Sequence, residues 1–279
     1  MAIIGHHQIR TIAVASGKGG VGKTNVVANL AIALQKEGKK VLILDADLGL
    51  SNIDVLLHLA PKYNIQNVLD GDMTLKDIVV EGPHGIKILP ATSGVQEMTS
   101  LDEFQRLRFL EEFESFEEEI DVLLIDTAAG ISENVAFFCI AAQEIIIVTS
   151  PDPTSIADAY ALIKVLYTRY QEKNLSLLVN SARDADEAKD VFKRLLTATE
   201  KFLHIGLDYL GFIPLDSAVT KAVRAQRAFV EAFPDSKASK KIAELAVKIL
   251  GRERIRVKGS LQFFIGNLLN SQSDTAKKC

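Results

Sequence analysis

Short apolar runs alternate along the chain with segments whose apolar residues repeat at helical spacing. Runs such as 122–126 and 145–150 are almost continuously apolar, which is typical of strands buried on both faces of a sheet. The pattern therefore predicts an α/β fold with a mostly parallel central sheet and helices on both faces. Strands are expected at 11–15, 41–45, 86–90, 122–126, 145–150, 176–180 and 209–214, and helices at 101–118, 132–142, 153–170, 185–203 and 236–250.

The segment 24–38 shows the helical period clearly. Its residues Val27, Leu30, Ala31 and Leu34 are expected on one helical face. Gly38 follows at the position where a glycine commonly ends a helix. The segment therefore predicts a helix with one buried face.

Bulk composition narrows the class of protein. The chain has 279 residues, 48% of them hydrophobic, and a formal net charge of −4, which suits one folded domain and does not favour direct, sequence-specific nucleic-acid binding. Its two cysteines, Cys139 and Cys279, form no C-x-x-C pair for an iron–sulfur or zinc site, and they suit a reducing cytosol. The longest apolar runs have strand length, so any membrane contact is expected to be peripheral.

Residues 17–24 read G-K-G-G-V-G-K-T and match the phosphate-binding loop G-x-x-x-x-G-K-[ST]. The loop follows a predicted strand and opens a predicted helix, so this context and the motif together predict a P-loop NTPase. Its glycines allow backbone N–H groups to turn toward phosphate oxygens. We expect Lys23 to reach the β- and γ-phosphates and Thr24 to hold Mg²⁺. The expected nucleotide contacts here are Gly17, Lys18, Gly19, Gly20, Val21, Gly22, Lys23, Thr24 and Asn25.

Lys18 is a second cation in this loop, and its early position points it outward. An outward lysine is most often solvated surface. The run K-G-G-V-G-K-T, however, resembles the deviant Walker A loop of the MinD/ParA family of dimerising ATPases. The resemblance implies an ATP-dependent homodimer in which Lys18 crosses to the nucleotide of the partner subunit. There it would act like an arginine finger on the γ-phosphoryl charge.

Carboxylates at predicted strand ends supply the remaining chemistry. Asp45 ends the strand 41–45 and is expected as an outer Mg²⁺ partner, while Asp47 is expected to position or deprotonate the attacking water. The alternative for Asp47 is a helix cap or a loop charge. Asp126 ends the run V-L-L-I-D as a Walker B aspartate does, which makes it a further Mg²⁺ partner. The family resemblance matches these segments to switch I and switch II.

Base recognition is expected at two further strand ends. Asn180 presents an amide, which suits the edge of adenine, and Pro214 and Asp216 follow the last strand. Ordinary turn chemistry is the alternative, above all for Asp216. The N-K-x-D pattern of guanine readers is missing from the sequence. ATP is therefore the nucleotide that the resemblance implies.

Several segments resemble one branch of this family, the flagellar-number regulators FlhG/FleN (YlxH). They are GKTNVVANLAIAL, LDADLGLSNIDVLL, ILPATSGVQEM, DTAAGIS, PDPTSIADAYALIK and QRAFVEAFPDSKAS. The resemblance implies slow, dimer-dependent ATP hydrolysis, with an FlhF-type GTPase and a FleQ-type transcription activator as partners. The residues before the first strand lack the D-Q-A-x-x-L-R motif of relatives that stimulate the GTPase. Two alternatives stay open, a ParA-like partitioning ATPase and an anti-activator binding module with little turnover.

The domain is expected to span 1–251, followed by a basic linker and a C-terminal helix with a disordered end in 252–279. One face of the helix is apolar, formed by Leu261, Phe264, Ile265, Leu268 and Leu269. The resemblance implies an ATP-dependent anchor, so that a cytoplasmic protein becomes peripheral on the cytoplasmic face of the inner membrane. A helix packed permanently on the domain is the alternative.

Overall fold

The structure is a computed structural model that describes residues 9–47, 52–91, 103–114, 116 and 119–253. Its strands are β1 (Arg10–Ser16), β2 (Val41–Ala46), β3 (Val80–Glu81), β4 (Lys87–Leu89), β5 (Val122–Ala129), β6 (Glu144–Thr149), β7 (Leu175–Ala182) and β8 (Asp208–Pro214). Its helices are α1 (Lys23–Lys36), α2 (Ile53–Leu56), α3 (Ile65–Asp70), α4 (Leu75–Ile78), α5 (Glu103–Glu114), α6 (Glu133–Ala141), α7 (Pro153–Tyr170), α8 (Ala185–Leu203), α9 (Ser217–Arg224), α10 (Phe229–Ala232) and α11 (Lys237–Leu250), with a 3₁₀ turn, η1, at Pro83–Gly85.

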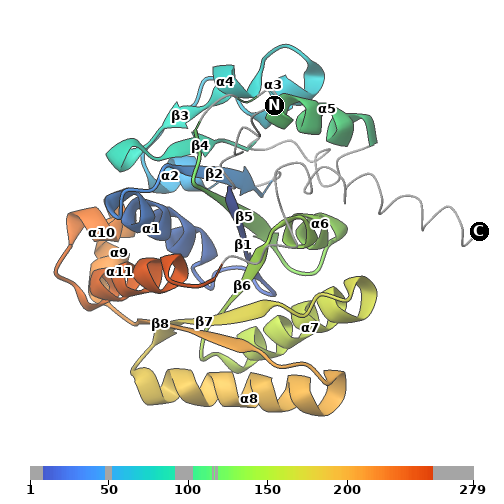
Figure 1. Ribbon diagram of the computed structural model, residues 1–279. Coiled ribbons are helices and arrows are strands. Elements are labelled where there is room, and N and C mark those ends of the chain that lie inside the picture. Colours follow the sequence, from blue (N-terminus) through green and yellow to red (C-terminus); the bar gives the residue numbers. More distant parts are fainter. Residues whose placement is uncertain (1–8, 48–51, 92–102, 115, 117–118, 254–279) are drawn as a thin grey trace, which may run out of the picture.

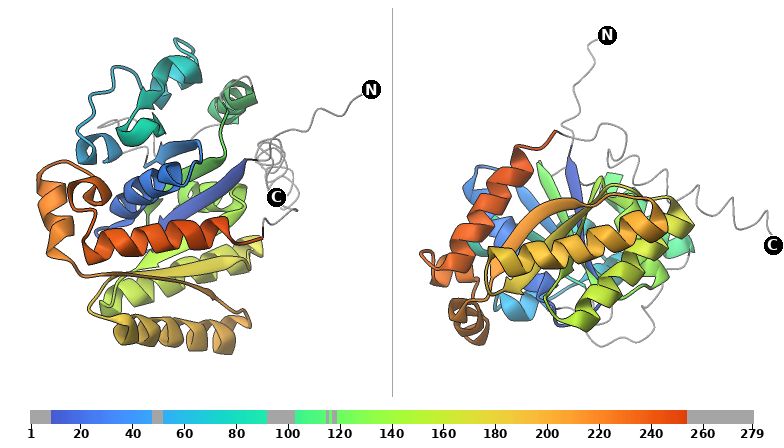
Figure 2. Two further views of the ribbon diagram at one scale, coloured as in Figure 1. Left: turned by 60° about the vertical axis from the view of Figure 1, so that its left-hand side comes forward. Right: turned by 90° about the horizontal axis from the view of Figure 1, so that it is seen from below.

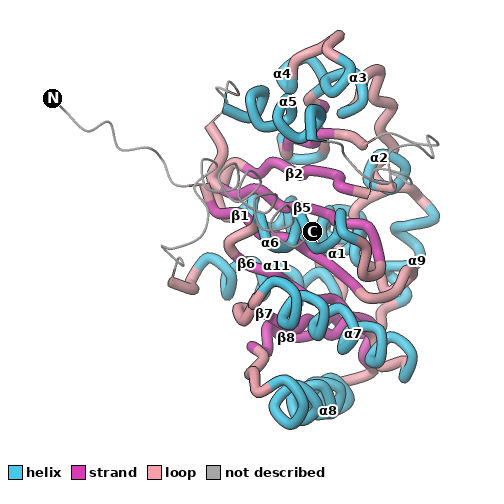
Figure 3. The backbone as a smooth tube through the Cα atoms, turned by 90° about the vertical axis from the view of Figure 1, so that its right-hand side faces the viewer, coloured by secondary structure: helices cyan, strands magenta, loops and turns pink. Residues whose placement is uncertain are grey.

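The strands form one central sheet in the order β3-β4-β2-β5-β1-β6-β7-β8 (Figures 1 and 3). All neighbours pair in parallel except β3, which runs antiparallel to β4. The predicted mostly parallel α/β fold is therefore confirmed. The order places β1 between β5 and β6, so the loop after β1 emerges at the middle of the carboxyl edge, where such sheets bind ligands.

Helices cover both faces of the sheet, as predicted. Successive residues of β1 point to opposite faces, so that Ile12 and Val14 join one buried cluster while Ala13 and Ala15 join the other. Figure 2 shows α1 and α11 side by side over the first face, with α7 and α8 over the opposite one. Each β-strand of the centre is thus buried on both sides, which explains its continuous apolar sequence.

Helix α1 departs from the predicted pattern of one buried face. Its residues from Val26 to Leu34 are all buried, including positions off the predicted face. The cause is its place between the sheet on one side and α10 and α11 on the other. Its end is as predicted: Gly38 has φ +78°, and its N–H donates to the carbonyl of Gln35 at 2.9 Å.

Element boundaries show where the sequence pattern was insufficient. The helix expected at 101–118 corresponds to α5, which spans Glu103–Glu114, so Phe116 lies outside it. Strand β5 continues beyond Asp126 to Ala129 instead of ending at the aspartate. The short elements α2, α3, α4, α9, α10 and β3 were not predicted, because a stretch of two to eight residues spans too few periods to show a pattern.

The predicted tail falls almost wholly outside the described residues, since 254–279 are not described. Arg252, expected to open the basic linker, donates a hydrogen bond to Oγ of Ser176 at 2.9 Å and lies 3.5 Å from a carboxylate oxygen of Asp208. This residue is therefore attached to the folded domain. Within the described ranges, no helix combines the length and the apolar character needed to cross a bilayer.

Candidate functional site

The glycine-rich loop joins the carboxyl end of β1 to the start of α1. Gly22 is the N-cap of α1 with φ +89°, and no side chain caps this helix. The first turn of α1 also carries no acidic residue. A 14-residue helix that begins in this way presents its N–H groups and partial positive charge to an anion. The predicted phosphate site therefore has the local structure that it requires.

Two glycines of the loop are required by close approach of neighbouring elements. A Cβ on Gly17 would lie 2.1 Å from the carbonyl oxygen of Asp158 in α7. A Cβ on Gly22 would lie 2.4 Å from Nδ2 of Asn180, which donates a hydrogen bond to the carbonyl of Val21 at 2.7 Å. Helix α7 and strand β7 thus hold the loop from two sides. Only glycine fits at both contacts.

A cleft of about 490 Å³ opens on this loop. It is lined by Ser16, Lys18, Gly19, Gly20, Val21, Gly22, Lys23, Thr24, Asn25, Asp47, Asn52, Ala128 and Ala129. A smaller cavity of about 70 Å³ is lined by Asn25, Asn180, Pro214, Asp216 and neighbouring residues. Asn25 lines both spaces, so they are neighbours. The structure therefore brings the predicted phosphate-side and base-side residues together along one path.

The predicted metal-side carboxylates lie next to each other in the sheet. Asp45 and Asp126 are direct register partners of β2 and β5, and both are buried. Asp45 Oδ1 accepts a hydrogen bond from the N–H of Asp47 at 3.1 Å. Nζ of the buried Lys23 lies 2.5 Å from Oδ1 of Asp126. Lys23 thus rests on the Walker B carboxylate, and a phosphate group entering the cleft competes with that carboxylate for it.

Removing one partner of this buried pair is expected to destabilise the fold. Asp126→Ala removes the carboxylate that pairs with the buried Lys23 ammonium, which is expected to cost about 3–5 kcal/mol of unfolding free energy. The control is Glu244→Ala, which breaks the exposed Lys241–Glu244 pair and is expected to change stability by less than about 1 kcal/mol. Urea denaturation of both variants measures the difference. Equal urea midpoints for Asp126→Ala and Glu244→Ala would contradict the assignment of Lys23 and Asp126 as a buried pair.

Lys18 points away from its own phosphate cradle, as predicted. Its backbone carbonyl accepts a hydrogen bond from Ser16 Oγ at 3.0 Å, while its Nζ donates to Oγ1 of Thr154 and lies 3.5 Å from Oδ1 of Asp152. The side chain remains 43% exposed. Exposed ion pairs of this kind contribute little to stability. The contact of Lys18 with the start of α7 is therefore expected to add little to stability.

Asp152 was not predicted as a partner of Lys18. It caps α7 by accepting hydrogen bonds from the N–H groups of Thr154 at 2.9 Å and Ser155 at 3.0 Å. The hydroxyl of Thr154 and then the N–H of Ser155 lower the pKa of Asp152 to about 2, so the carboxylate stays charged at neutral pH. The D-P-T sequence does signal a helix start. Its contact with Lys18 is tertiary and leaves no mark in the sequence pattern.

On the base side, Asp216 has a clear structural role. Its two carboxylate oxygens accept hydrogen bonds from the N–H of Ala218 at 2.9 Å and of Ala238 at 3.2 Å. The hydrogen bond from Ala218 is the main cause that lowers the pKa of Asp216. Asp216 therefore caps α9 and attaches it to α11, as the alternative interpretation held. A contact of Asp216 or Asn180 with a base stays a prediction.

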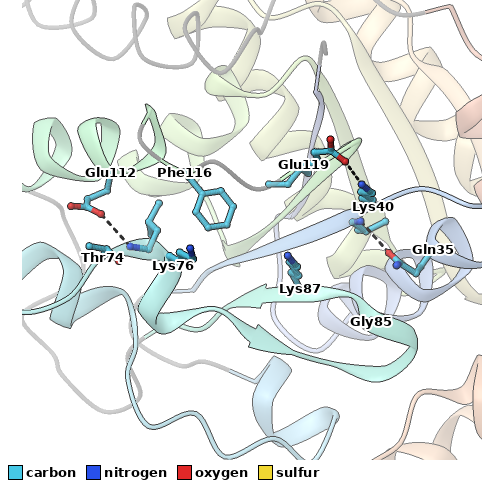
Figure 4. Close-up of a pocket in the computed structure, with 12 residues that line it drawn as sticks. Gln35, Lys40, Thr74, Lys76, Gly85, Lys87, Glu112, Phe116 and Glu119 are labelled. Carbon is cyan, nitrogen blue, oxygen red and sulfur yellow. Dashed lines mark hydrogen bonds and ion pairs between the residues drawn. The ribbon is translucent and has the colours of Figure 1, made fainter. Parts of the chain in front are cut away.

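A larger cavity than the nucleotide cleft, about 690 Å³, lies elsewhere (Figure 4). It lies at the opposite, amino edge of the sheet, where Val41 and Lys87 begin β2 and β4. Lys40 pairs there with Glu119. The cavity contains none of the predicted site residues and no helix start of the glycine-loop type. The nucleotide cleft is therefore defined by its chemistry and not by its size.

The sheet order, the glycine loop at the start of α1 and the paired aspartates define a P-loop NTPase. A family model described as "ParA: NUBPL iron-transfer P-loop NTPase" matches residues 8–250. The chain is 45% identical to the antiactivator FleN of Pseudomonas aeruginosa over 264 residues, which cover 94% of each chain. It is 35% identical to the flagellum site-determining protein YlxH of Helicobacter pylori, over 84% of this chain and 80% of YlxH.

Solved structures agree with these relatives. MinD in the MinC:MinD complex of Aquifex aeolicus superposes with a TM-score of 0.69 at 30% identity, covering 90% of this chain and 98% of that one. MinD of Pyrococcus horikoshii, solved with Mg-ADP, gives 0.68 at 27% identity, covering 86% and 96%. The chain therefore belongs to the ParA family of P-loop NTPases and to its FleN/YlxH-type branch. It is an ATPase with a MinD-like fold.

Proposed function

We propose that the chain is an ATP-gated dimerisation switch that regulates flagellar number and flagellar biosynthesis. The observation that carries the proposal is the place of Lys18, which belongs to the phosphate loop but rests outside its own cradle on Thr154 and Asp152. A cation in this position has no phosphate to neutralise within its own subunit. When two subunits close face to face with ATP between them, each Lys18 lies against a phosphate of the ATP bound by the partner subunit.

Within each subunit, the proposed roles follow from the chemistry of the cleft. Lys23 leaves Asp126 to bind the β- and γ-phosphates, and Asp47 orients the attacking water. Asn180, Pro214 and Asp216 border the adenine. The loop glycines and Asn25 surround the phosphates.

Mg²⁺ fits the donors on the metal side of the cleft. The hydroxyl of Thr24 and the buried carboxylates of Asp45 and Asp126 are oxygen donors, the type that Mg²⁺ prefers. We propose that these residues hold the ion directly or through water. When bound, the ion neutralises phosphate charge. The Mg-ADP bound by the P. horikoshii MinD supports this assignment.

The proposed partners follow from the relatives. A FleQ-type transcription activator as partner fits the name antiactivator given to FleN, and an FlhF-type GTPase is the partner that the family resemblance implies. We further propose that the C-terminal segment 252–279 carries the cytoplasmic ATP-bound dimer to the inner membrane as a peripheral protein. Dimerisation doubles a weak anchor and thereby strengthens it by avidity.

Complementation tests the cellular function. In P. aeruginosa lacking its own FleN, expression of the chain is expected to return the number of flagella per cell to that of the parent strain. Lys18→Ala, expressed at the same level, is expected to leave the number as in the deletion strain, because its dimer cannot complete the site. Electron microscopy of negatively stained cells gives the count. Equal rescue by the wild type and Lys18→Ala, or no rescue by either, would contradict the proposal.

A further inference from the structure

Two short helices border the nucleotide site at its two ends. Helix α2 begins after Asn52, which lines the phosphate cleft, and α9 begins after Asp216, which lines the base cavity. Figure 3 shows α2 and α9 on the same flank of the molecule. The two helices are far apart in sequence, and their final turns are joined by side chains.

Both helices end in the same backbone motif. After α2, the N–H of Leu59 donates to the carbonyl of Asp54 at 2.8 Å, with His58 between in a left-handed conformation, φ +53°. After α9, Gln226 occupies the corresponding position with φ +51°. The N–H of the next residue, Arg227, donates to the carbonyl of Ala222 at 3.1 Å, as that of Leu59 does to Asp54. Glycine is the usual residue at this position, because a Cβ is strained there.

The side chains of these two residues contact each other. Gln226 Nε2 donates to the carbonyl of Val55 in α2 at 3.0 Å, and its Oε1 lies 3.0 Å from Nδ1 of His58. Because the amide nitrogen is used on Val55, the amide oxygen accepts from His58, which places the proton on Nδ1. We name the pair of Gln226 and His58 the Gln226–His58 latch. It gives both side chains a function that glycine could not supply.

Two other helix ends provide a comparison within the same chain. Gln171 ends α7 with φ +59°, and His204 ends α8 with φ +57°. Both side chains are exposed at the surface. No hydrogen bond between either side chain and another helix is found among residues 119–253 or elsewhere in the described ranges. They match the two latch residues in residue type and backbone conformation.

We propose that Gln226 and His58 are positioning residues for ATP hydrolysis. Asp216 fixes the start of α9 to the base cavity and to α11. The latch fixes the end of α2 to the end of α9, and α2 begins directly after Asn52, which lines the phosphate cleft. The latch thus couples the base side of the site, through α2, to Asn52 on its phosphate side. This inference rests on the proposed hydrolysis of ATP in this cleft.

Glycine substitution removes the side chain and relieves the backbone strain at the same time. A fall in kcat would then reflect the lost contact between α2 and α9 and not a less stable fold. In the full-length chain, Gln226→Gly and His58→Gly are each expected to lower kcat for ATP about 5- to 20-fold, with KM changed by less than about twofold. The kcat of the double variant is expected to be no lower than that of the more impaired single variant, because both substitutions break the same contact. Gln171→Gly and His204→Gly are the matched controls and are expected to retain wild-type kcat. Melting temperatures of all four single variants are expected to equal or exceed that of the wild type.

Hydrolysis is measured at one protein concentration over a range of ATP concentrations up to saturation, which gives both kcat and KM. A kcat for Gln226→Gly equal to that of Gln171→Gly, or additive losses in the double variant, would overturn the proposal. Asp47→Ala in the same assay separates the proposed role of Asp47 from the proposed role of the latch. If Asp47→Ala loses turnover while Gln226→Gly does not, only the proposal for the latch is overturned. If Asp47→Ala retains turnover, the proposed role of Asp47 fails first.

A second substitution covers the case in which a glycine variant melts lower than its control. Gln226→Glu keeps the acceptor for His58 but removes the donor for the Val55 carbonyl, with no change in backbone strain. A kcat between those of the wild type and Gln226→Gly supports the latch. A wild-type kcat overturns it.

Discussion

Lys18→Ala is expected to lower ATP turnover by about 10³-fold or more while leaving ATP affinity nearly unchanged. The ammonium group of Lys18 contacts Thr154 and Asp152 at the start of α7, so we expect the ground-state nucleotide to lose little when it is removed. The γ-phosphoryl charge of the transition state, however, loses the cation that only a closed dimer delivers. Phosphate release measures turnover, and titration with a fluorescent ATP analogue measures affinity.

Mixing two inactive variants tests whether Lys18 acts across the dimer. In a heterodimer of Lys18→Ala with Asp47→Ala, the site of the Lys18→Ala subunit has its own Asp47 and receives Lys18 from its partner. An equimolar mixture is therefore expected to recover a substantial part of wild-type turnover. A lysine acting within its own subunit would leave both sites defective. A mixture as inactive as its components would contradict action in trans.

Asp47→Ala is expected to lower turnover by about 10²–10⁴-fold, because the attacking water loses the group that orients it or takes its proton. Nucleotide binding is expected to persist, since Asp47 lines the open side of the cleft and the loop contacts remain. The expected consequence is accumulation of an ATP-bound state. Single-turnover hydrolysis of radiolabelled ATP measures the chemical step. A rate within about fivefold of the wild type would remove Asp47 from the mechanism.

The sequence predicted the sheet and the place of the site, because both follow from local chemistry. Short apolar runs that alternate with segments of helical period are typical of strands covered on both faces, and parallel strands bring their carboxyl ends to one edge. For this reason Lys23, Asp45 and Asp126 were found from motifs that belong to three separate strands, the loop after β1 and the strands β2 and β5, and the structure brings them together.

What the sequence did not predict depends on tertiary contacts. The all-round burial of α1 comes from α10 and α11, which lie more than 190 residues later in the chain. The resting contact of Lys18 with Asp152 joins residues 134 positions apart. Both carboxylate oxygens of Asp216 are occupied by backbone N–H groups, one of them from the start of α11. Local sequence patterns identify each of these residues but do not reveal that they are in contact in the folded chain.

The Gln226–His58 latch had a partial signal. Two residues other than glycine at helix ends of the left-handed type are unusual, yet the same types occur at Gln171 and His204 without a cross-helix bond. Only the spatial contact of α9 with α2 distinguishes the pairs.

The most direct test of nucleotide-gated dimerisation is the molecular mass in solution, measured by light scattering with ADP and with ATP for the wild type and Asp47→Ala. The account predicts that Asp47→Ala forms a stable dimer with ATP, because it closes but cannot reset, while every ADP sample stays monomeric. A mass that is independent of nucleotide in both proteins would contradict the account and leave a nucleotide-binding module without a dimerisation switch.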